Sequence, residues 1–152
     1  MNYLCCFCKQ RNEINKLKAA DNSIPLFSLN NHKYKAKVVN VYDGDTIKVV
    51  ILFNNKLTRF SLRMTGYDSP ELRTKNQNEK DAAIKARNAL SSKINNKIID
   101  LHCGKFDKYG RLLGEIYINK NDKKSINQIM VDEGHGYAYD GGTKKAFKVS
   151  AV

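Results

Sequence analysis

Three apolar stretches that are broken by polar turn residues begin near residue 34 and have the pattern of β-strands. YKAKVVNVYD (34–43) is rich in β-branched residues and runs into the turn residues DGD. TIKVVILF (46–53) follows and stops at NNK, a second turn signal. LTRFSLRMTG (57–66) alternates up to its closing glycine. Strands joined by short turns are typical of hairpins, so this region predicts a three-stranded antiparallel meander.

The pattern of apolar residues then changes to that of a helix. Ala83, Ala86, Leu90 and Ile94 recur at helical spacing, with Lys and Arg on the other faces. This pattern predicts a helix of about four turns over residues 78–94.

Two further strands and a second helix complete the pattern. KIIDLHCGKF (97–106) and RLLGEIYIN (111–119) have strand character and are separated by the turn DKYG. SINQIMVDEG predicts a short helix, because Ser125 and Gln128 have the spacing of a capping box and Gly134 suits a C-cap.

The order of these elements indicates the fold class. Three strands, a helix, two strands and a helix predict an α+β, mainly β protein. We expect a five-stranded OB-fold Greek-key barrel with two or three helices packed on it, although other α+β folds share this order. Residues 1–33 show no sustained period and are predicted to be a flexible N-terminal extension. The domain is expected over 34–147, with a C-terminal tail at 148–152.

The charge of the chain indicates the kind of partner it binds. The 152 residues include 27 Lys and Arg against 15 Asp and Glu, a formal net charge of +12 with a pI of about 9.6. This excess favours a polyanion, with nucleic acid the first candidate and an anionic membrane surface the second. A Lys-rich surface that only maintains solubility is the alternative. No apolar run approaches 18 residues, so no membrane-spanning segment is expected.

Three of the four cysteines crowd the start of the chain, in LCCFCK, which does not suggest a disulfide framework. The start lacks the pattern of a secretory signal, and we therefore expect an intracellular, reducing location. Cys5, Cys6 and Cys8 lie beside basic residues and could be S-acylated, which would tether the chain to a membrane. Free thiols in a tail are the alternative. A zinc site is disfavoured, because the spacing is tight and His32 is far away.

Acids and arginines near the predicted strand ends are the candidates for chemistry. Asp43 and Asp45 flank a glycine, and Asp68 opens the motif DSPE, which ends at Glu71. If the substrate is a phosphodiester, Asp45 and Asp68 could share a hard cation, which prefers oxygen ligands. Glu71 could hold or deprotonate the attacking water.

Arginine is scarce in this chain, with 6 among the 27 basic residues. Arg63 on the third strand and Arg111 after DKYG could neutralise charge on the transition state, since the guanidinium grips phosphate oxygens in fixed geometry. Each of these candidates has a structural alternative. Asp43 suits a turn that accepts backbone hydrogen bonds, Asp68 suits an Asx-turn, and the two arginines suit surface or turn positions.

The combination DGDT, SLRMTGYDSPE and DKYGR, in this order, resembles the staphylococcal nuclease (thermonuclease) family over about residues 34–147. The resemblance implies an OB-fold barrel and Ca²⁺-dependent hydrolysis of DNA and RNA, leaving 3′-phosphate ends. It also implies the role of each site residue. Asp45 and Asp68 match metal ligands, together with the backbone carbonyl of Ser69. Glu71 matches the general base.

The same resemblance extends to residues that bind phosphate and nucleotide. Arg63 and Arg111 match the two phosphate arginines, and Asp43 matches an acid beside the metal ligands. The matches to nucleotide-contacting positions are Lys108, Tyr109 and either Tyr139 or Tyr137. The expected partners are DNA and RNA, with single strands preferred, and we expect a monomer.

A nucleic-acid-binding OB module that has lost catalysis is the rival hypothesis. Such a module would be expected to lack some of the five residues that carry the chemistry. All five are present: Asp45, Arg63, Asp68, Glu71 and Arg111. The sequence therefore favours an active nuclease.

Overall fold

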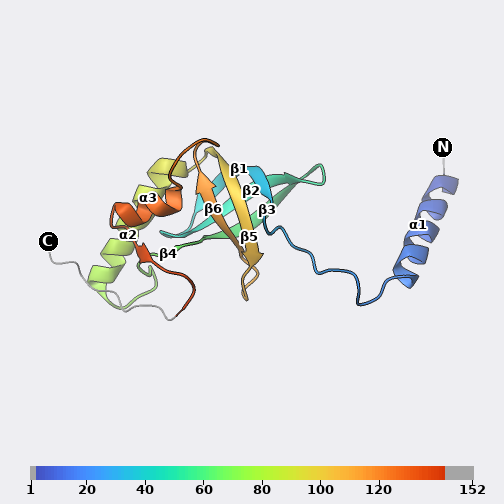
Figure 1. Cartoon of the computed structure of the whole chain (residues 1–152), viewed down its shortest axis with the longest axis horizontal. Coiled ribbons are helices and arrows are strands. Elements are labelled where there is room, and N and C mark those ends of the chain that lie inside the picture. Colours follow the sequence, from blue (N-terminus) through green and yellow to red (C-terminus); the bar gives the residue numbers. More distant parts are fainter. Residues whose placement is uncertain (1–2, 143–152) are drawn as a thin grey trace.

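In the computed structural model five strands close into a barrel (Figure 1). The structure describes residues 3–142, and their side chains from residue 10 onward. The barrel strands are β1 (Lys33–Val41), β2 (Thr46–Phe53), β3 (Lys56–Met64), β5 (Ile98–Phe106) and β6 (Leu112–Tyr117). They follow the order β1-β2-β3-β6-β5, and β5 returns to pair with β1. All pairs are antiparallel except β3 with β6. The predicted meander and OB-type barrel are confirmed.

The barrel core follows from the geometry of the strands, in which successive side chains lie on opposite faces. Every second residue of β2 points inward, and Ile47, Val49 and Ile51 are almost completely buried. Leu62 on β3 and Leu101 on β5 contribute in the same way. Because a one-residue slip would turn this whole set outward, burial of one face holds the register of the strands.

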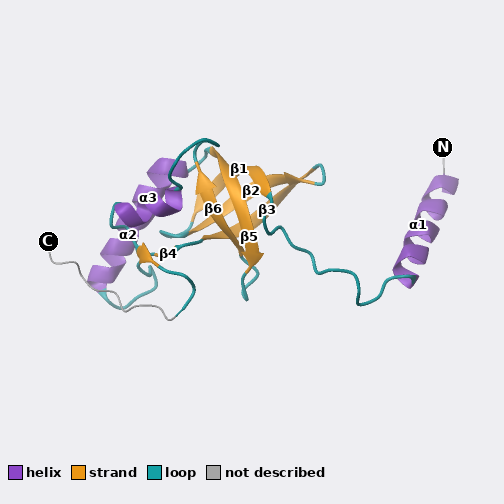
Figure 2. Cartoon of the chain, in the orientation of Figure 1, coloured by secondary structure: helices purple, strands orange, loops and turns teal. Residues whose placement is uncertain are grey.

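Helices α2 (Gln77–Ile94) and α3 (Ile126–Asp132) pack beside the barrel (Figure 2). The buried residues of α2 are the four predicted by helical spacing: Ala83, Ala86, Leu90 and Ile94. The Ser125 side chain accepts from the Gln128 amide and so begins α3, and Gly134 lies just beyond its end with φ of 75°. Asn127 on α3 donates to the carbonyls of Thr65 and Gly114, which ties the helix to the barrel.

A two-stranded sheet that the sequence did not predict lies beside the barrel. It joins β4 (Tyr67–Asp68) to β7 (Tyr137–Ala138). The amide of Tyr139 extends the pairing by donating to the carbonyl of Gly66 at 3.0 Å. Strands of two residues have no period to detect. Their pairing nevertheless brings the segment around Tyr139 next to the DSPE loop.

The N-terminal extension contains a helix, α1 (Tyr3–Lys18), where the sequence predicted none. Residues 10–18 are exposed on every side, so α1 has no buried face that a hydrophobic period could reveal. It contains neither Gly nor Pro, which explains why it can be helical without packing. Figure 1 shows α1 apart from the barrel. Cys5, Cys6 and Cys8 belong to this helix, but their side chains lie outside the described part.

The segment between α1 and β1 contacts the barrel. Phe27 packs on Phe53 and Phe106, with ring centroids 5.6 and 6.0 Å away, and Leu29 is buried in the core. The extension therefore joins the barrel a few residues before position 33. The predicted tail at 148–152 lies outside the described residues. No helix within residues 3–142 is long and apolar enough to cross a bilayer.

Candidate active site

The turn between β1 and β2 is shaped by Asp43 and Gly44. The Asp43 carboxylate accepts from the amides of Asp45 and Thr46 at 3.0 and 2.6 Å, which is the structural role predicted for an acid before a strand. Gly44 lies against Ser69 and helix α2. A Cβ at this position would come within 2.6 Å of the Ser69 Cβ. This turn therefore requires glycine, because only glycine allows Asp45 to lie so close to the DSPE loop.

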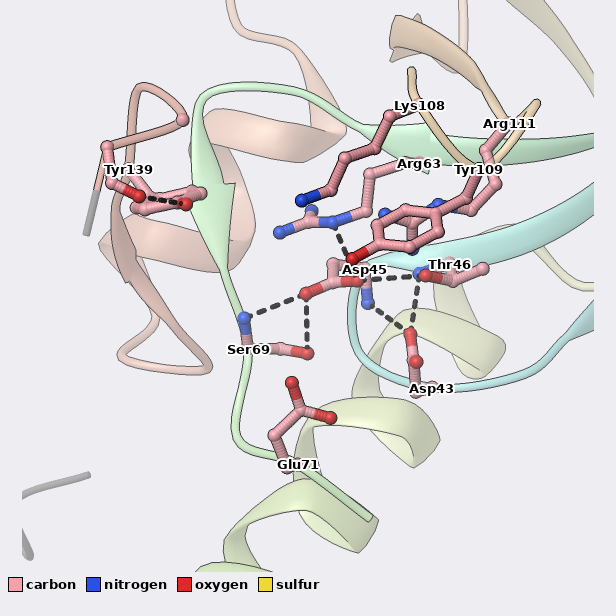
Figure 3. A pocket seen from close by; sticks show the side chains of 12 residues that line it. Asp43, Asp45, Thr46, Arg63, Ser69, Glu71, Lys108, Tyr109, Arg111 and Tyr139 are labelled. Carbon is pink, nitrogen blue, oxygen red and sulfur yellow. Dashed lines mark hydrogen bonds and ion pairs between the residues drawn. The ribbon is translucent and has the colours of Figure 1, made fainter. Parts of the chain in front are cut away.

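Asp45 is 6% exposed, and both of its carboxylate oxygens have partners (Figure 3). Oδ1 accepts from the Thr46 hydroxyl at 3.0 Å and lies 3.2 Å from Nε of Arg63. Oδ2 accepts from both the amide and the hydroxyl of Ser69, each at 2.9 Å. Asp45 thus links the β1–β2 turn to the loop that follows β4. The assignment of the Ser69 carbonyl as a metal ligand stays a prediction.

Arg63 joins the two predicted metal carboxylates. Its guanidinium is 2.7 Å from Asp68 through Nη2, and Nη1 donates to the carbonyl of Met64 at 2.6 Å. Asp68 is 3% exposed and also accepts from the hydroxyl of Tyr137 at 3.1 Å. Two buried acids therefore converge on a single buried cation. Such a cluster is costly to desolvate and keeps its charges only because they compensate one another.

A cavity of about 380 Å³ opens in front of these groups. Its lining includes the residues predicted to be catalytic or to contact the nucleotide, three residues predicted at or beside the metal site, and three further residues. In chain order they are Asp43, Asp45, Thr46, Arg63, Ser69, Glu71, Lys108, Tyr109, Arg111, Tyr139, Gly141 and Gly142. Asp68 is not among the lining residues, and it contacts Arg63 and Tyr137. Glu71 is exposed, and its carboxylate points from the DSPE loop toward Ser69 (Figure 3).

The turn between β5 and β6 supplies the opposite wall of the cavity. Asp107 accepts from the amides of Tyr109 and Arg111, each at 2.9 Å, and its other oxygen binds Nε of Arg111 at 2.7 Å. Partial burial opposes ionisation of Asp107, but the hydrogen bonds from Arg111 lower its pKa. Arg111 and Lys108 both lie over the Tyr109 ring, 5.5 and 5.1 Å from its centroid. The turn therefore presents two cations and an aromatic ring to the cavity.

The acids of the site repel one another where no cation separates them. Burial raises the pKa of Asp43 to about 6, and the neighbouring Asp45 carboxylate adds to this rise. The amides that Asp43 accepts from act in the opposite direction. At neutral pH Asp43 is ionised at a cost, and the site thus concentrates negative charge beside Arg63.

The donor atoms suit a hard divalent cation. Asp45 and Asp68 contribute two buried carboxylates that both contact the Arg63 guanidinium. Among residues 10–142 no group of three or more His, Cys, Asp or Glu side chains is arranged to hold a metal. Two carboxylates would therefore need carbonyl and water ligands to complete the shell. Ca²⁺ accepts such a mixed set of oxygens, whereas zinc prefers a closed nitrogen or sulfur set.

The structure brings the predicted residues together and adds others that the sequence analysis missed. Gly44, Thr46, Tyr67 and Asp107 all shape the site, and the hydroxyl of Tyr67 donates to the Gly44 carbonyl. The motifs DGDT and DKYGR contain three of these residues, so their position was a usable signal. Tyr137 and Tyr139, which the sequence left as alternatives, both lie at the site. Tyr137 donates to Asp68, and Tyr139 lines the cavity.

Comparison with known proteins identifies a family. The family model described as "Staphylococcal nuclease homologue" matches residues 61–150 of the chain. This match includes Arg63, Asp68, Glu71 and Arg111, and it begins after the turn that carries Asp45.

Curated relatives support the same assignment. The micrococcal nuclease of Shigella flexneri is 30% identical over 112 residues, covering 70% of this chain and 59% of the relative. Endonuclease YncB of Bacillus subtilis (strain 168) is 32% identical over 123 residues, covering 74% and 55%. An uncharacterized endonuclease of Escherichia coli O157:H7 is 31% identical over 104 residues, covering 68% and 60%. The chain spans about three fifths of the length of such relatives.

Proposed function

We propose that this chain hydrolyses phosphodiester bonds in DNA and RNA, because it belongs to the staphylococcal nuclease homologue family. One observation carries this proposal. A single cavity brings Glu71, Arg63 and Arg111 together with Asp45, and the guanidinium of Arg63 lies 2.7 Å from Asp68. A phosphodiester needs charge neutralisation, a positioned water and an exit for the leaving oxygen, and these side chains can meet the first two needs. The relatives named nuclease and endonuclease support the same activity.

In the proposed reaction a water attacks phosphorus as Glu71 accepts its proton. The bond from phosphorus to the 5′ oxygen breaks, and that oxygen takes a proton from solvent. The phosphate then stays on the 3′ oxygen of the preceding nucleotide. Arg63 and Arg111 neutralise the phosphoryl oxygens as negative charge develops on them, an effect worth roughly 3–4 kcal/mol for one such donor. Arg111 lines the cavity and is positioned for this task by Asp107, which binds its Nε at 2.7 Å.

We propose Ca²⁺ as the cofactor, held by the carboxylates of Asp45 and Asp68 and by the carbonyl of Ser69. Bound there, it would supply Lewis-acid polarisation of the phosphoryl oxygen and extra positive charge. The convergence of two buried acids supports this assignment, because buried carboxylates are stable as ions only beside compensating cations. Asp43 acts through the turn, since its hydrogen bonds fix the amides of Asp45 and Thr46.

Product analysis distinguishes this function from that of a module that only binds nucleic acid. Labelled single-stranded DNA and RNA of 12 nucleotides would be incubated with the chain in Ca²⁺, and the product ends would be identified by their need for phosphatase before 3′ extension. The proposal expects cleavage with 3′-phosphate ends, and a Glu71→Gln variant that binds the DNA but cleaves it far more slowly. Binding without cleavage by the parent chain would instead establish the lapsed module.

We further propose that the chain is a monomer located inside the cell and S-acylated at Cys5, Cys6 and Cys8. In S-acylation a cysteine thiolate attacks a fatty acyl thioester, a new cysteine thioester forms, and the carrier thiol leaves. The basic residues that follow in α1, Lys9 and Arg11, would favour an anionic membrane surface. Labelling with an alkyne analogue of palmitate in cells, followed by thioester cleavage, tests the tether. Equal labelling of the parent and a triple Cys→Ser variant would refute it.

A further inference from the structure

The cavity continues onto an exposed face of the β2–β3 ribbon. Thr46 and Arg63, which line the cavity, are register partners on neighbouring strands. The register is unbroken along the whole ribbon, so side chains two residues further along each strand lie on the same face. The next pairs on this face are Lys48 with Ser61, Val50 with Arg59, and Leu52 with Leu57. This face therefore runs without interruption from Arg63 to the tip of the hairpin.

This outer face of the ribbon is accessible to solvent, whereas the opposite face of the same two strands is turned to the core. The alternate residues of both strands, such as Ile47 and Leu62, fill the core. On the outer face Arg59 is exposed, while Leu52 and Leu57 are 59% and 80% exposed. Two exposed leucines opposite each other on a hairpin form an apolar surface with no cover within the described residues.

The charge of this face has one sign. Strands β1, β2 and β3 contain no Asp or Glu. Lys48 and Arg59 lie on the ribbon. Lys37 of β1 lies beside them as the register partner of Val50, and its ammonium donates to the carbonyl of Asn96. Lys35 lies further along β1, where Asp100 of β5 already pairs with it at 2.7 Å. Positive charge thus borders the path on both the β1 and β3 sides.

We infer that this face, defined by Lys37, Lys48, Val50, Leu52, Leu57 and Arg59, is a track for a single-stranded nucleic acid that extends from the active site. The inference rests on the proposed function, because it takes the scissile phosphate to lie beside Arg63. Two features select this partner: the charge is complementary to a phosphate backbone, and the track is continuous with the catalytic cavity. The leucines would contact bases or sugars, which every sequence offers.

The spacing of the track matches an extended strand. Successive side chains on one face of a β-strand are about 6.7 Å apart, so Arg59 lies about 13 Å from Arg63. An extended single strand repeats its phosphates at a comparable interval. Lys48 and Arg59 would therefore meet the first and second phosphates beyond the one that is cleaved. This track is separate from Lys108, Tyr109 and Tyr139, which line the cavity from other elements.

The test uses the full chain and a double variant, Lys48→Gln/Arg59→Gln. The matched control is Arg11→Gln/Lys123→Gln, which removes the same charge from α1 and from the exposed loop before α3. Binding of a fluorescent 12-nucleotide DNA would be measured in chelator at 50 to 200 mM salt. Cleavage of a dinucleotide and of the 12-nucleotide DNA would be measured in Ca²⁺. Thermal unfolding of each protein verifies folding.

Loss of two phosphate contacts should reduce the slope of log affinity against log salt by about 1.4, since each contact on a single strand contributes about 0.7. Over this fourfold rise in salt, the parent would lose about sevenfold more affinity than the double variant. The KM for the 12-nucleotide DNA should rise about tenfold in the double variant, whereas dinucleotide cleavage and the control variant should resemble the parent.

Different outcomes separate the track from the proposed function. Parent-like salt slope and KM in the double variant would overturn the track, as would an equal loss on both substrates. A double variant that loses binding to anionic phospholipid vesicles, with oligonucleotide binding unchanged, would overturn it too and assign the face to membranes. If the parent cleaves neither substrate, the proposed nuclease function fails, but the salt slope still decides whether the track binds nucleic acid.

Discussion

Removing Arg63 would test how the site tolerates its own negative charge. Arg63 is 8% exposed, and its guanidinium lies 3.2 Å from Asp45 and 2.7 Å from Asp68. In an Arg63→Ala variant both carboxylates would remain buried without that counter-charge. Breaking a buried ion pair by removing one partner costs about 3–5 kcal/mol. The two pairs share one cation, so their costs are not additive, and we expect a total near this range in chelator.

Calcium should reverse much of this loss. If Asp45 and Asp68 hold the cation, the variant has the same two carboxylates without a competing positive charge, and its affinity for Ca²⁺ should rise. A ligand at 100 times its dissociation constant stabilises the folded state by about 2.7 kcal/mol. The gain in unfolding free energy on adding Ca²⁺ should therefore be larger in Arg63→Ala than in the parent.

Urea unfolding followed by circular dichroism, with Ca²⁺ and with chelator, measures both quantities. Arg11→Ala is the control, because Arg11 is exposed on α1 and its removal should change stability by less than about 0.5 kcal/mol. An Arg63→Ala protein as stable as the parent in chelator would refute the argument that Arg63 compensates two buried acids. An equal Ca²⁺ gain in both proteins would refute the placement of the cation between them.

Three further predictions concern other residues of the site. In chelator, the stability of the parent should fall by roughly 2–3 kcal/mol as pH rises from 4 to 6, because the folded state with its raised Asp43 pKa of about 6 holds a proton that the unfolded chain releases. Asp43→Asn should remove this component, and an unchanged pH dependence of urea midpoints would contradict it. Asp107→Asn should lower kcat about tenfold or more by releasing Arg111, with far-UV circular dichroism unchanged; parent-like kcat would show that Asp107 does not position it. Glu71→Gln should lower kcat by about 10²–10⁴ with little change in DNA binding, and a similar kcat would exclude Glu71 as the base.

The barrel could be predicted because its strands are half-buried. LTRFSLRM alternates apolar with polar residues, whereas TIKVVILF is mostly apolar and was predicted from the turn signals on either side. Burial of one face of each strand determines the register. The four buried residues of α2 were identified by spacing for the same reason. Helix α1 could not be found in this way, since no face of it is buried among residues 10–18.

The residues of the site could be predicted, but their partners could not. Asp43, Asp45, Glu71 and Arg111 stood out as acids and a rare arginine at strand ends. That Ser69 donates twice to Asp45 depends on how closely the turn at Gly44 approaches the DSPE loop, which is a tertiary fact. The pairing of β4 with β7 is likewise a contact between distant segments, and it was needed to place Tyr137 on Asp68.

The most direct test of the proposed function is the rate at which the purified chain cleaves a labelled single-stranded DNA, in Ca²⁺ and in chelator. Arg111→Ala would be compared with the parent, with Arg11→Ala as the control. The account predicts cleavage by the parent and the control only when Ca²⁺ is present, and a rate at least 10²-fold lower in Arg111→Ala. Full cleavage in chelator, or by Arg111→Ala in Ca²⁺, would contradict it.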